Sequence, residues 1–167
     1  GCPQGHRRGC RALVRQALQE DMGSGDVTSQ ALVSESCGAS AEIVSRHDAV
    51  VAGVGLGELV FRELDSAAQY RWCAADGETV RPGQRVALIE GRARDLLAGE
   101  RTALNFMQRL SGIATLTRRF VDKVGAWPVM ILDTRKTTPL FRTLEKYAVR
   151  CGGGENHRRG LYDRALI

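Results

Sequence analysis

Apolar residues recur at steps of three and four over three long stretches of the sequence. Such spacing places them on one face of a helix, and it predicts helices over 11–22, 93–124 and 139–150. Ser111-Gly112 is expected to divide the middle stretch into two helices, and Thr138 to cap the last one. The last helix should bury a stripe of four side chains: Leu140, Leu144, Tyr147 and Ala148.

Shorter apolar runs predict strands between these helices. Residues 39–52 indicate one strand, and residues 70–91 indicate a series of short strands separated by glycine-containing turns. The glycine-rich stretch 53–57 lacks the full spacing of a phosphate-binding loop. We therefore expect a turn there, leading into a helix over 58–64.

The C-terminal part of the sequence has the order of elements that opens a parallel α/β barrel. An apolar run over 129–132 predicts a buried strand, a charged loop and a helix follow, and another strand is expected to begin at 165–167. A barrel with two strands would leave pairing edges and apolar faces exposed. We therefore expect the sequence to be part of a longer protein.

The composition is that of a globular protein. Of the 167 residues, 43% are hydrophobic and 26% are charged, and no apolar run approaches the roughly 20 residues of a membrane-spanning helix. The five cysteines lack the close pairing of a disulfide framework, which predicts reduced thiols and a cytoplasmic protein. Cys2, His6 and Cys10 could offer three metal ligands, but no fourth is evident, so no metal site is expected there.

Positive charge is concentrated near the end of the sequence. The net charge is +5, and residues 133–164 contain eight Lys or Arg against four acids. Arg135 and Lys136 follow the predicted strand, and His157 and Arg158 belong to a glycine-rich turn. Anionic ligands of α/β proteins bind at strand ends and helix amino termini. The two loops therefore predict a site for a small acidic ligand with more than one carboxylate.

Two other functional classes lack a feature that they require. The short strands over 70–91 resemble biotinyl and lipoyl carrier modules, which need a modifiable lysine at a hairpin tip, but the only lysines are Lys123, Lys136 and Lys146. Nucleic-acid binding is not favoured, because aromatic residues make up 5% of the chain and no basic helix is predicted. On pattern alone, Arg101 is an ordinary exposed helix arginine.

Seven short motifs occur in an order typical of one family. They resemble the motifs of quinolinate phosphoribosyltransferase, the decarboxylating nicotinate-nucleotide pyrophosphorylase, and the resemblance extends from about residue 11 to the last residue. Each motif is weak alone, but the ordered set is specific. The motifs lie at 20–21, 25–28, 99–105, 110–115, 133–137, 146–149 and 152–158.

The resemblance implies a fold and a reaction. Members have an N-terminal α/β sandwich domain, expected here over 1–112, and an incomplete TIM-like α/β barrel, whose truncated first part would occupy 113–167. They transfer phosphoribose from phosphoribosyl pyrophosphate to quinolinate in the presence of Mg²⁺. The products are nicotinate mononucleotide for NAD synthesis, pyrophosphate and CO₂.

The resemblance also assigns residues and partners. The family forms homodimers or larger homo-oligomers, and neither nucleic acid nor a membrane is an expected partner. One subunit supplies the position of Arg101 to the site of its neighbour. Residues for Mg²⁺, ribose and phosphate are expected outside these 167 residues. If the family's site residues are carried over position by position, the residues that would bind quinolinate here are Arg101, Thr134, Arg135, Lys136, His157 and Arg158.

Two departures from the family pattern leave alternatives open. Leu140-Phe141 replaces a glycine-containing pair expected after Thr-x-Pro, and the donor half of the site is expected beyond Ile167. The 167-residue chain alone is therefore expected to be inactive. The alternatives are a related pyrophosphorylase-like protein linked to molybdate transport, and a truncated, inactive binding or assembly domain.

Overall fold

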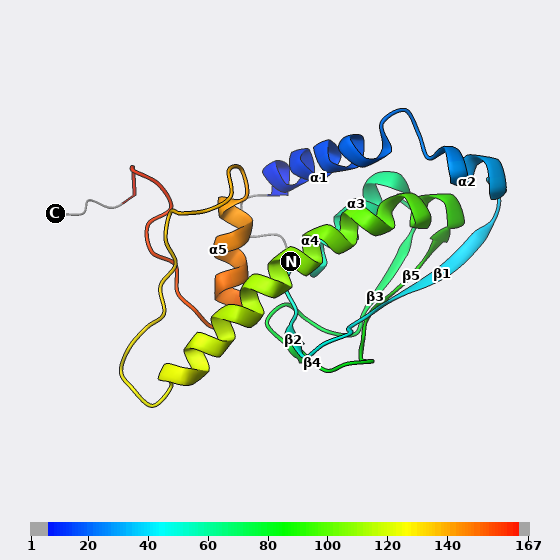
Figure 1. Cartoon of the computed structure of the whole chain (residues 1–167). Coiled ribbons are helices and arrows are strands. Elements are labelled where there is room, and N and C mark those ends of the chain that lie inside the picture. Colours follow the sequence, from blue (N-terminus) through cyan, green and yellow to red (C-terminus); the bar gives the residue numbers. More distant parts are fainter. Residues whose placement is uncertain (1–6, 164–167) are drawn as a thin grey trace.

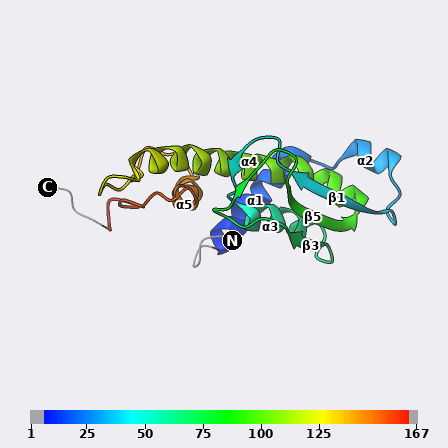
Figure 2. The same cartoon turned by 90° about the horizontal axis from the view of Figure 1, so that it is seen from below.

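The computed structural model describes residues 7–163 and is organised around one long helix, α4 (Ala93–Val124). At 1.5 Å per residue its length is about 48 Å. Its first half runs beside the N-terminal helices and strands, and its second half beside the C-terminal loops (Figures 1 and 2). The predicted division at Ser111-Gly112 is wrong. Leu110 and Ala114 are fully buried around it, and their packing outweighs the weak helix propensity of glycine.

Within residues 7–163, five strands form two small antiparallel sheets, and the short strands predicted over 70–91 are confirmed. The larger sheet has the order β1-β5-β3, and the smaller one pairs β2 with β4. The bounds are β1 (Gly38–Val44), β2 (Ala49–Val50), β3 (Gln69–Trp72), β4 (Thr79–Val80) and β5 (Arg85–Arg92).

The register of the larger sheet places Ile89, a buried residue of β5, opposite Ala41 of β1. The single strand predicted over 39–52 is wrong, because a turn separates β1 from β2. In this turn the Ser45 hydroxyl donates to the carbonyl of His47 (2.7 Å). Such local side-chain bonds favour turns over a continuous strand.

Three further helices precede α4. α1 (Arg7–Met22) confirms the helix predicted over 11–22, and α2 (Val27–Leu32) and α3 (Val54–Leu64) follow. Asp26 caps α2, since its carboxylate accepts a hydrogen bond from the backbone N of Ser29 (3.0 Å). None of the described helices is both long and apolar enough to cross a membrane.

The glycine-rich stretch 53–57 is not the predicted turn, because α3 begins at Val54. The first glycine of the stretch has a φ of 94° and precedes the helix. The Asp76 carboxylate accepts from the backbone N of Val54 (3.0 Å). Gly57 permits close packing on α4, since a Cβ there would lie 2.7 Å from the sulfur of Met107. The glycines therefore serve the capping and packing of a helix.

One core joins the N-terminal helices to the last helix, α5 (Arg142–Cys151). It contains Val14 of α1 and Leu110 of α4, both fully buried, together with Leu144 and Ala148 of α5. Because α5 shares this core, the loops that contact α5 are held in place relative to α4.

The buried strand predicted over 129–132 is wrong. The structure has one isolated parallel bridge there, between Leu132 and Glu155, and Met130 is 72% exposed. Val129 and Leu132 are exposed as well, and only Ile131 of the four apolar residues is half-buried. The strand expected at 165–167 lies outside the described residues.

The start of α5 also differs from the prediction. The helix begins at Arg142, and Thr138 does not cap it, because the Thr138 hydroxyl donates to Glu145 Oε1 (2.8 Å). Leu140 is 85% exposed with a φ of 66°, so it does not belong to the buried stripe. The other three members of the predicted stripe are buried or half-buried.

The cysteines are partly as predicted. Cys37, Cys73 and Cys151 are free. Cys10 is disulfide-bonded, so the prediction of reduced thiols throughout is wrong at this position. Sequence spacing alone does not tell which sulfurs approach one another. The other members of the candidate metal set, Cys2 and His6, lie outside the described residues.

Candidate functional site

Two basic loops lie side by side beyond α4, as the sequence predicted. The segments that lead into them run parallel: the backbone N of Asp133 donates to the carbonyl of Glu155 (3.1 Å), and the N of Glu155 donates to the carbonyl of Ile131 (2.8 Å). We call residues 133–138 the first basic loop and residues 156–160 the second basic loop.

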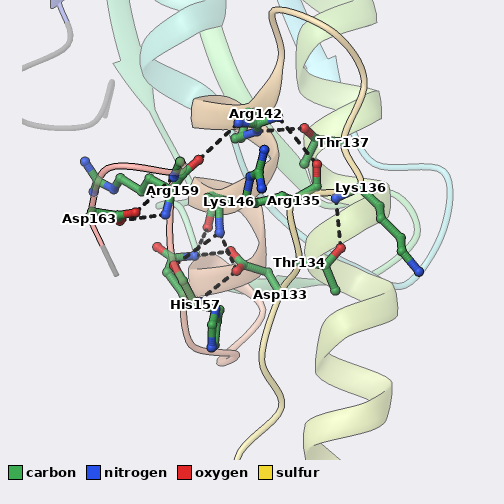
Figure 3. Close-up of polar contacts among 12 residues, drawn as sticks. Asp133, Thr134, Arg135, Lys136, Thr137, Arg142, Lys146, His157, Arg159 and Asp163 are labelled. Atoms are coloured by element: carbon green, nitrogen blue, oxygen red, sulfur yellow. Dashed lines mark hydrogen bonds and ion pairs between the residues drawn. The ribbon is translucent and has the colours of Figure 1, made fainter. Parts of the chain in front are cut away.

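A buried ion pair fastens both loops to α5 (Figure 3). Lys146 Nζ donates to Asp133 Oδ1 (2.5 Å), and the two side chains are 4% and 6% exposed. Asp133 also accepts from the backbone N of His157 (2.9 Å) and from the side-chain amide of Asn156 (2.7 Å). A buried ion pair is tolerated when further hydrogen bonds satisfy its members. Lys146 is therefore a structural cation.

Arg142, at the start of α5, contacts both basic loops. Its Nε donates to the hydroxyl of Thr137 (3.2 Å) and its Nη2 to the carbonyl of Arg135 (3.5 Å). Its Nη1 donates to the carbonyl of Arg159 in the second loop (3.1 Å). All three nitrogens of this guanidinium are directed at neutral oxygens of the protein.

Glu145 holds the end of the first basic loop. It accepts from Arg109 Nη2 (2.7 Å), and from the hydroxyl (2.8 Å) and backbone N (3.2 Å) of Thr138. Burial alone would raise the pKa of the Glu145 carboxyl, but these hydrogen bonds outweigh it and hold the pKa below its usual value. Arg142, Glu145 and Lys146 thus contact the first loop from positions that share one face of a helix.

The five predicted residues of the loops are close in the backbone, but their side chains diverge. Figure 3 shows Arg135 turned toward α5, whereas Lys136 and His157 point away from it. Arg135 Nε is buried and has no hydrogen-bond partner within the described part of the chain. The Thr134 hydroxyl accepts from the backbone N of Lys136 (3.0 Å) and so stabilises the loop. Arg158 is partly buried in the second loop.

Arg101 lies apart from these loops. It is exposed on the first half of α4. Arg109, which contacts the first basic loop, lies about 12 Å further along the helix axis. The structure therefore does not bring Arg101 to the basic loops of its own chain.

Two clefts flank the loops. One, of about 420 Å³, lies between α1, α4 and the first loop and includes Glu20, Arg109 and Thr138. The other, of about 260 Å³, lies beside α5, and none of the six predicted residues lines either cleft. Among the described residues, no three His, Cys, Asp or Glu side chains are grouped so that they could hold a metal ion. The cleft beside α5 is lined mainly by Arg142, Lys146, Tyr147, Arg150, Arg159 and Tyr162.

Sequence reasoning did not single out the α5 residues that organise this site. A signal was present, because the charged residues Arg142, Glu145 and Lys146 have the spacing of one helix face. That face lies beside Leu144 and Ala148, which are buried. Charged side chains next to a buried stripe are expected to find partners within the protein.

The comparisons with known proteins agree on one family. The model described as "Quinolinate phosphoribosyl transferase, N-terminal domain" matches residues 26–111, and the one described as "Quinolinate phosphoribosyl transferase, C-terminal domain" matches residues 113–167. The chain is 42% identical over 158 residues to quinolinate phosphoribosyltransferase (decarboxylating) 1 of Nicotiana glauca. It is 46% identical over 158 residues to the probable nicotinate-nucleotide pyrophosphorylase (carboxylating) of Bacillus subtilis (strain 168).

Those alignments cover 94% of this chain but 45% and 54% of the two relatives, so the chain spans about half the length of the curated relatives it matches. The nicotinate-nucleotide pyrophosphorylase structure from Francisella tularensis superposes with a TM-score of 0.91 at 41% identity, covering 96% of this chain and 57% of that one. The Ehrlichia chaffeensis structure gives 0.88 at 39% identity, covering 93% and 57%. The α/β fold predicted from the sequence is confirmed, and the chain belongs to the quinolinate phosphoribosyl transferase family.

Proposed function

We propose that this family member transfers the phosphoribosyl group of phosphoribosyl pyrophosphate to quinolinate, and that the 167 residues carry the quinolinate-binding part. The ring nitrogen bonds to the ribose C1 as pyrophosphate leaves. The carboxylate next to the nitrogen departs as CO₂, and the ring carbon keeps the bonding electrons and takes up a proton. The product is nicotinate mononucleotide.

The observation that carries the proposal is the pair of basic loops fixed side by side by Asp133. Quinolinate is a dianion, and Arg135 has a buried Nε without a partner in the described part of the chain. Arginine recognises carboxylates through paired hydrogen bonds. Fixed cations such as Lys136 and Arg158 would also stabilise the negative charge that decarboxylation leaves on the ring.

Mg²⁺ is proposed as the ion that accompanies phosphoribosyl pyrophosphate and offsets charge on the leaving pyrophosphate. The described residues do not offer a grouping of side chains that fits a metal. No step of the reaction is therefore assigned to a metal held by these residues.

We also propose a homodimer or larger homo-oligomer in which Arg101 completes the site of the neighbouring subunit. The exposure of Arg101 and its separation from the loops of its own chain support this arrangement. A cytoplasmic location is proposed as well; the free thiols of Cys37, Cys73 and Cys151 support it, whereas the disulfide at Cys10 does not.

The test uses a chain extended to the length of its relatives. Given quinolinate, phosphoribosyl pyrophosphate and Mg²⁺, it should form nicotinate mononucleotide, whereas the 167-residue chain alone should not. Absence of product from the extended chain contradicts the proposal and favours a binding or assembly domain. Turnover of another acceptor in place of quinolinate favours the relative linked to molybdate transport.

In the extended chain, Arg135→Ala should weaken quinolinate binding by about ten- to a hundredfold, since hydrogen bonds to charged groups contribute roughly 1.5–3 kcal/mol. Isothermal titration with quinolinate and with nicotinate gives the measurement. Nicotinate, with one carboxylate, should lose less affinity. Arg46→Ala, in the exposed turn between β1 and β2, is the control and should bind as the wild type does. Equal losses for both ligands contradict a role of Arg135 in recognising the second carboxylate.

A further inference from the structure

Arg142 is the described side chain whose contacts join the middle of the first basic loop to the second. Its Nη2 reaches the carbonyl of Arg135 (3.5 Å), and its Nη1 reaches the carbonyl of Arg159 (3.1 Å). Its Nε donates to the Thr137 hydroxyl (3.2 Å). One rigid fork therefore spans the gap between the two loops (Figure 3).

The charge of Arg142 alone does not account for this arrangement. All three acceptors are uncharged oxygens, and no carboxylate of the described residues forms an ion pair with the guanidinium. A lysine would keep the positive charge, but its single compact ammonium lacks the planar fork that reaches three separated oxygens. The contacts thus depend on the shape of the arginine group.

We propose that Arg142 is a positioning residue for the acceptor site, an inference that rests on the proposed function. By binding the carbonyl of Arg135, it sets the direction in which the Arg135 side chain leaves the loop. By binding the carbonyl of Arg159, it fixes the second loop against the first. Arg142 therefore acts on quinolinate through Arg135 and the second loop and does not touch the substrate itself.

The experiment compares Arg142→Lys and Arg142→Gln in the extended chain. Both should raise the KM for quinolinate by about ten- to a hundredfold, the size expected when the hydrogen bonds of Arg135 to a charged ligand are lost. The KM for phosphoribosyl pyrophosphate should change less than about twofold, because the donor contacts are separate. Arg142→Lys should not bring the KM for quinolinate closer to the wild-type value than Arg142→Gln does, because lysine keeps the positive charge but lacks the planar fork.

Arg94→Lys is the matched control. Arg94 also spans two backbone carbonyls, those of Val33 (2.7 Å) and Gln30 (3.1 Å), and in addition it forms an ion pair with the exposed Glu35 (3.2 Å). It belongs to the start of α4, which lies near α2 and far from α5 (Figure 1). Its variant should lose thermal stability to a similar extent and keep the wild-type KM for quinolinate. If it raises that KM equally, the effect is a general loss of structure and the proposal is overturned.

Other outcomes are equally decisive. A near-normal quinolinate KM for Arg142→Lys beside a raised KM for Arg142→Gln would show that charge is what matters, which overturns the positioning role. If Arg142→Gln does not fold, Thr137→Val removes only the acceptor of Nε and should raise the quinolinate KM about two- to fivefold; no change overturns the proposal. If the extended wild-type chain makes no nicotinate mononucleotide, the proposed function is wrong, and the positioning role of Arg142, which rests on it, is wrong as well.

Discussion

Two tyrosines differ in what their hydroxyl groups contact. The Tyr147 hydroxyl donates to an Asp76 carboxylate oxygen at 2.5 Å. The Tyr70 hydroxyl is buried and has no hydrogen-bond partner among residues 7–163. Burial raises the pKa of both phenols, and the Asp76 carboxylate raises that of Tyr147 further. Both groups therefore stay protonated near neutral pH, but among residues 7–163 only the Tyr147 hydroxyl has a hydrogen-bond partner.

The same substitution should therefore have different consequences for stability at the two positions. Tyr147→Phe should lower the free energy of unfolding by about 1.5–3 kcal/mol, the usual contribution of a hydrogen bond to a charged group. Tyr70→Phe should leave it unchanged or raise it by up to about 1 kcal/mol, because a buried donor without a partner is removed. Urea unfolding of the two variants measures the difference. Equal losses would mean that the Tyr70 hydroxyl has a partner after all.

Leu140 has a backbone conformation that suits glycine. Its φ of 66° costs a residue with a Cβ about 1–2 kcal/mol, and its side chain is 85% exposed. Leu140→Gly should therefore raise the free energy of unfolding by up to about 1 kcal/mol, after the greater freedom of glycine in the unfolded chain is counted. Leu140→Ala keeps the strain and should give no gain. A loss on Leu140→Gly, measured by thermal unfolding, would contradict this prediction.

At the scale of the elements, the carboxylate of Glu63 connects α3 with α1. Arg11 and Arg15, one turn apart on α1, both donate to the carboxylate of Glu63 on α3, the second at 2.7 Å. The Glu63 side chain is 7% exposed. Burial alone would raise the pKa of its carboxyl, but the hydrogen bonds from Arg15 and Arg11 outweigh it and hold the pKa below the usual value.

This lowered pKa predicts a dependence of stability on pH. The contribution of Glu63 is fully present above the ordinary glutamate pKa and is lost as the pH falls through the lowered value in the folded protein. Glu63→Gln should cost about 1 kcal/mol at pH 7 and should make unfolding less sensitive to acid below about pH 4.5. Urea unfolding from pH 7 to pH 3 provides the measurement. Parallel curves for the variant and the wild type would contradict it.

Helices whose buried side chains recur with the helix period could be predicted from the sequence. α1 and α4 follow from the three- and four-residue steps, because core-facing side chains of a helix recur with the helix period. The stretch 53–57 could not be predicted, since the close packing of Gly57 on Met107 is a tertiary contact with a residue far away in the sequence. The apolar run 129–132 predicted a buried strand, but periodicity does not tell which segment would cover it.

The candidate site was predictable in its location but not in its internal roles. Loop position and charge were enough to single out Arg135 and Lys136. The same criteria could not distinguish a cation that is available to bind a ligand from one that stabilises the fold. Lys146 is paired with Asp133 in the interior, whereas Arg135 Nε has no partner in the described part of the chain. That distinction depends on tertiary contacts.

Across the whole molecule, α4 links two groups of functional candidates. Its residue Arg109 holds the first basic loop of the same chain through Glu145 and Thr138. Its residue Arg101, nearer the start of the helix, is exposed. In the proposed dimer, one rigid helix would therefore support the loop of its own subunit and supply an arginine to the site of the other.

This arrangement predicts complementation between two inactive variants of the extended chain. Arg101→Ala and Lys136→Ala each remove one residue of every site in a homodimer. If a site takes Arg101 from one subunit and Lys136 from the other, a mixed dimer contains one intact site. With random pairing, half of the dimers are mixed and one of their two sites is intact, so the mixture should regain up to about a quarter of the wild-type activity. Nicotinate mononucleotide formation is measured after subunit exchange has been verified by mass spectrometry. If verified mixed dimers stay inactive, Arg101 acts within its own subunit or outside the site.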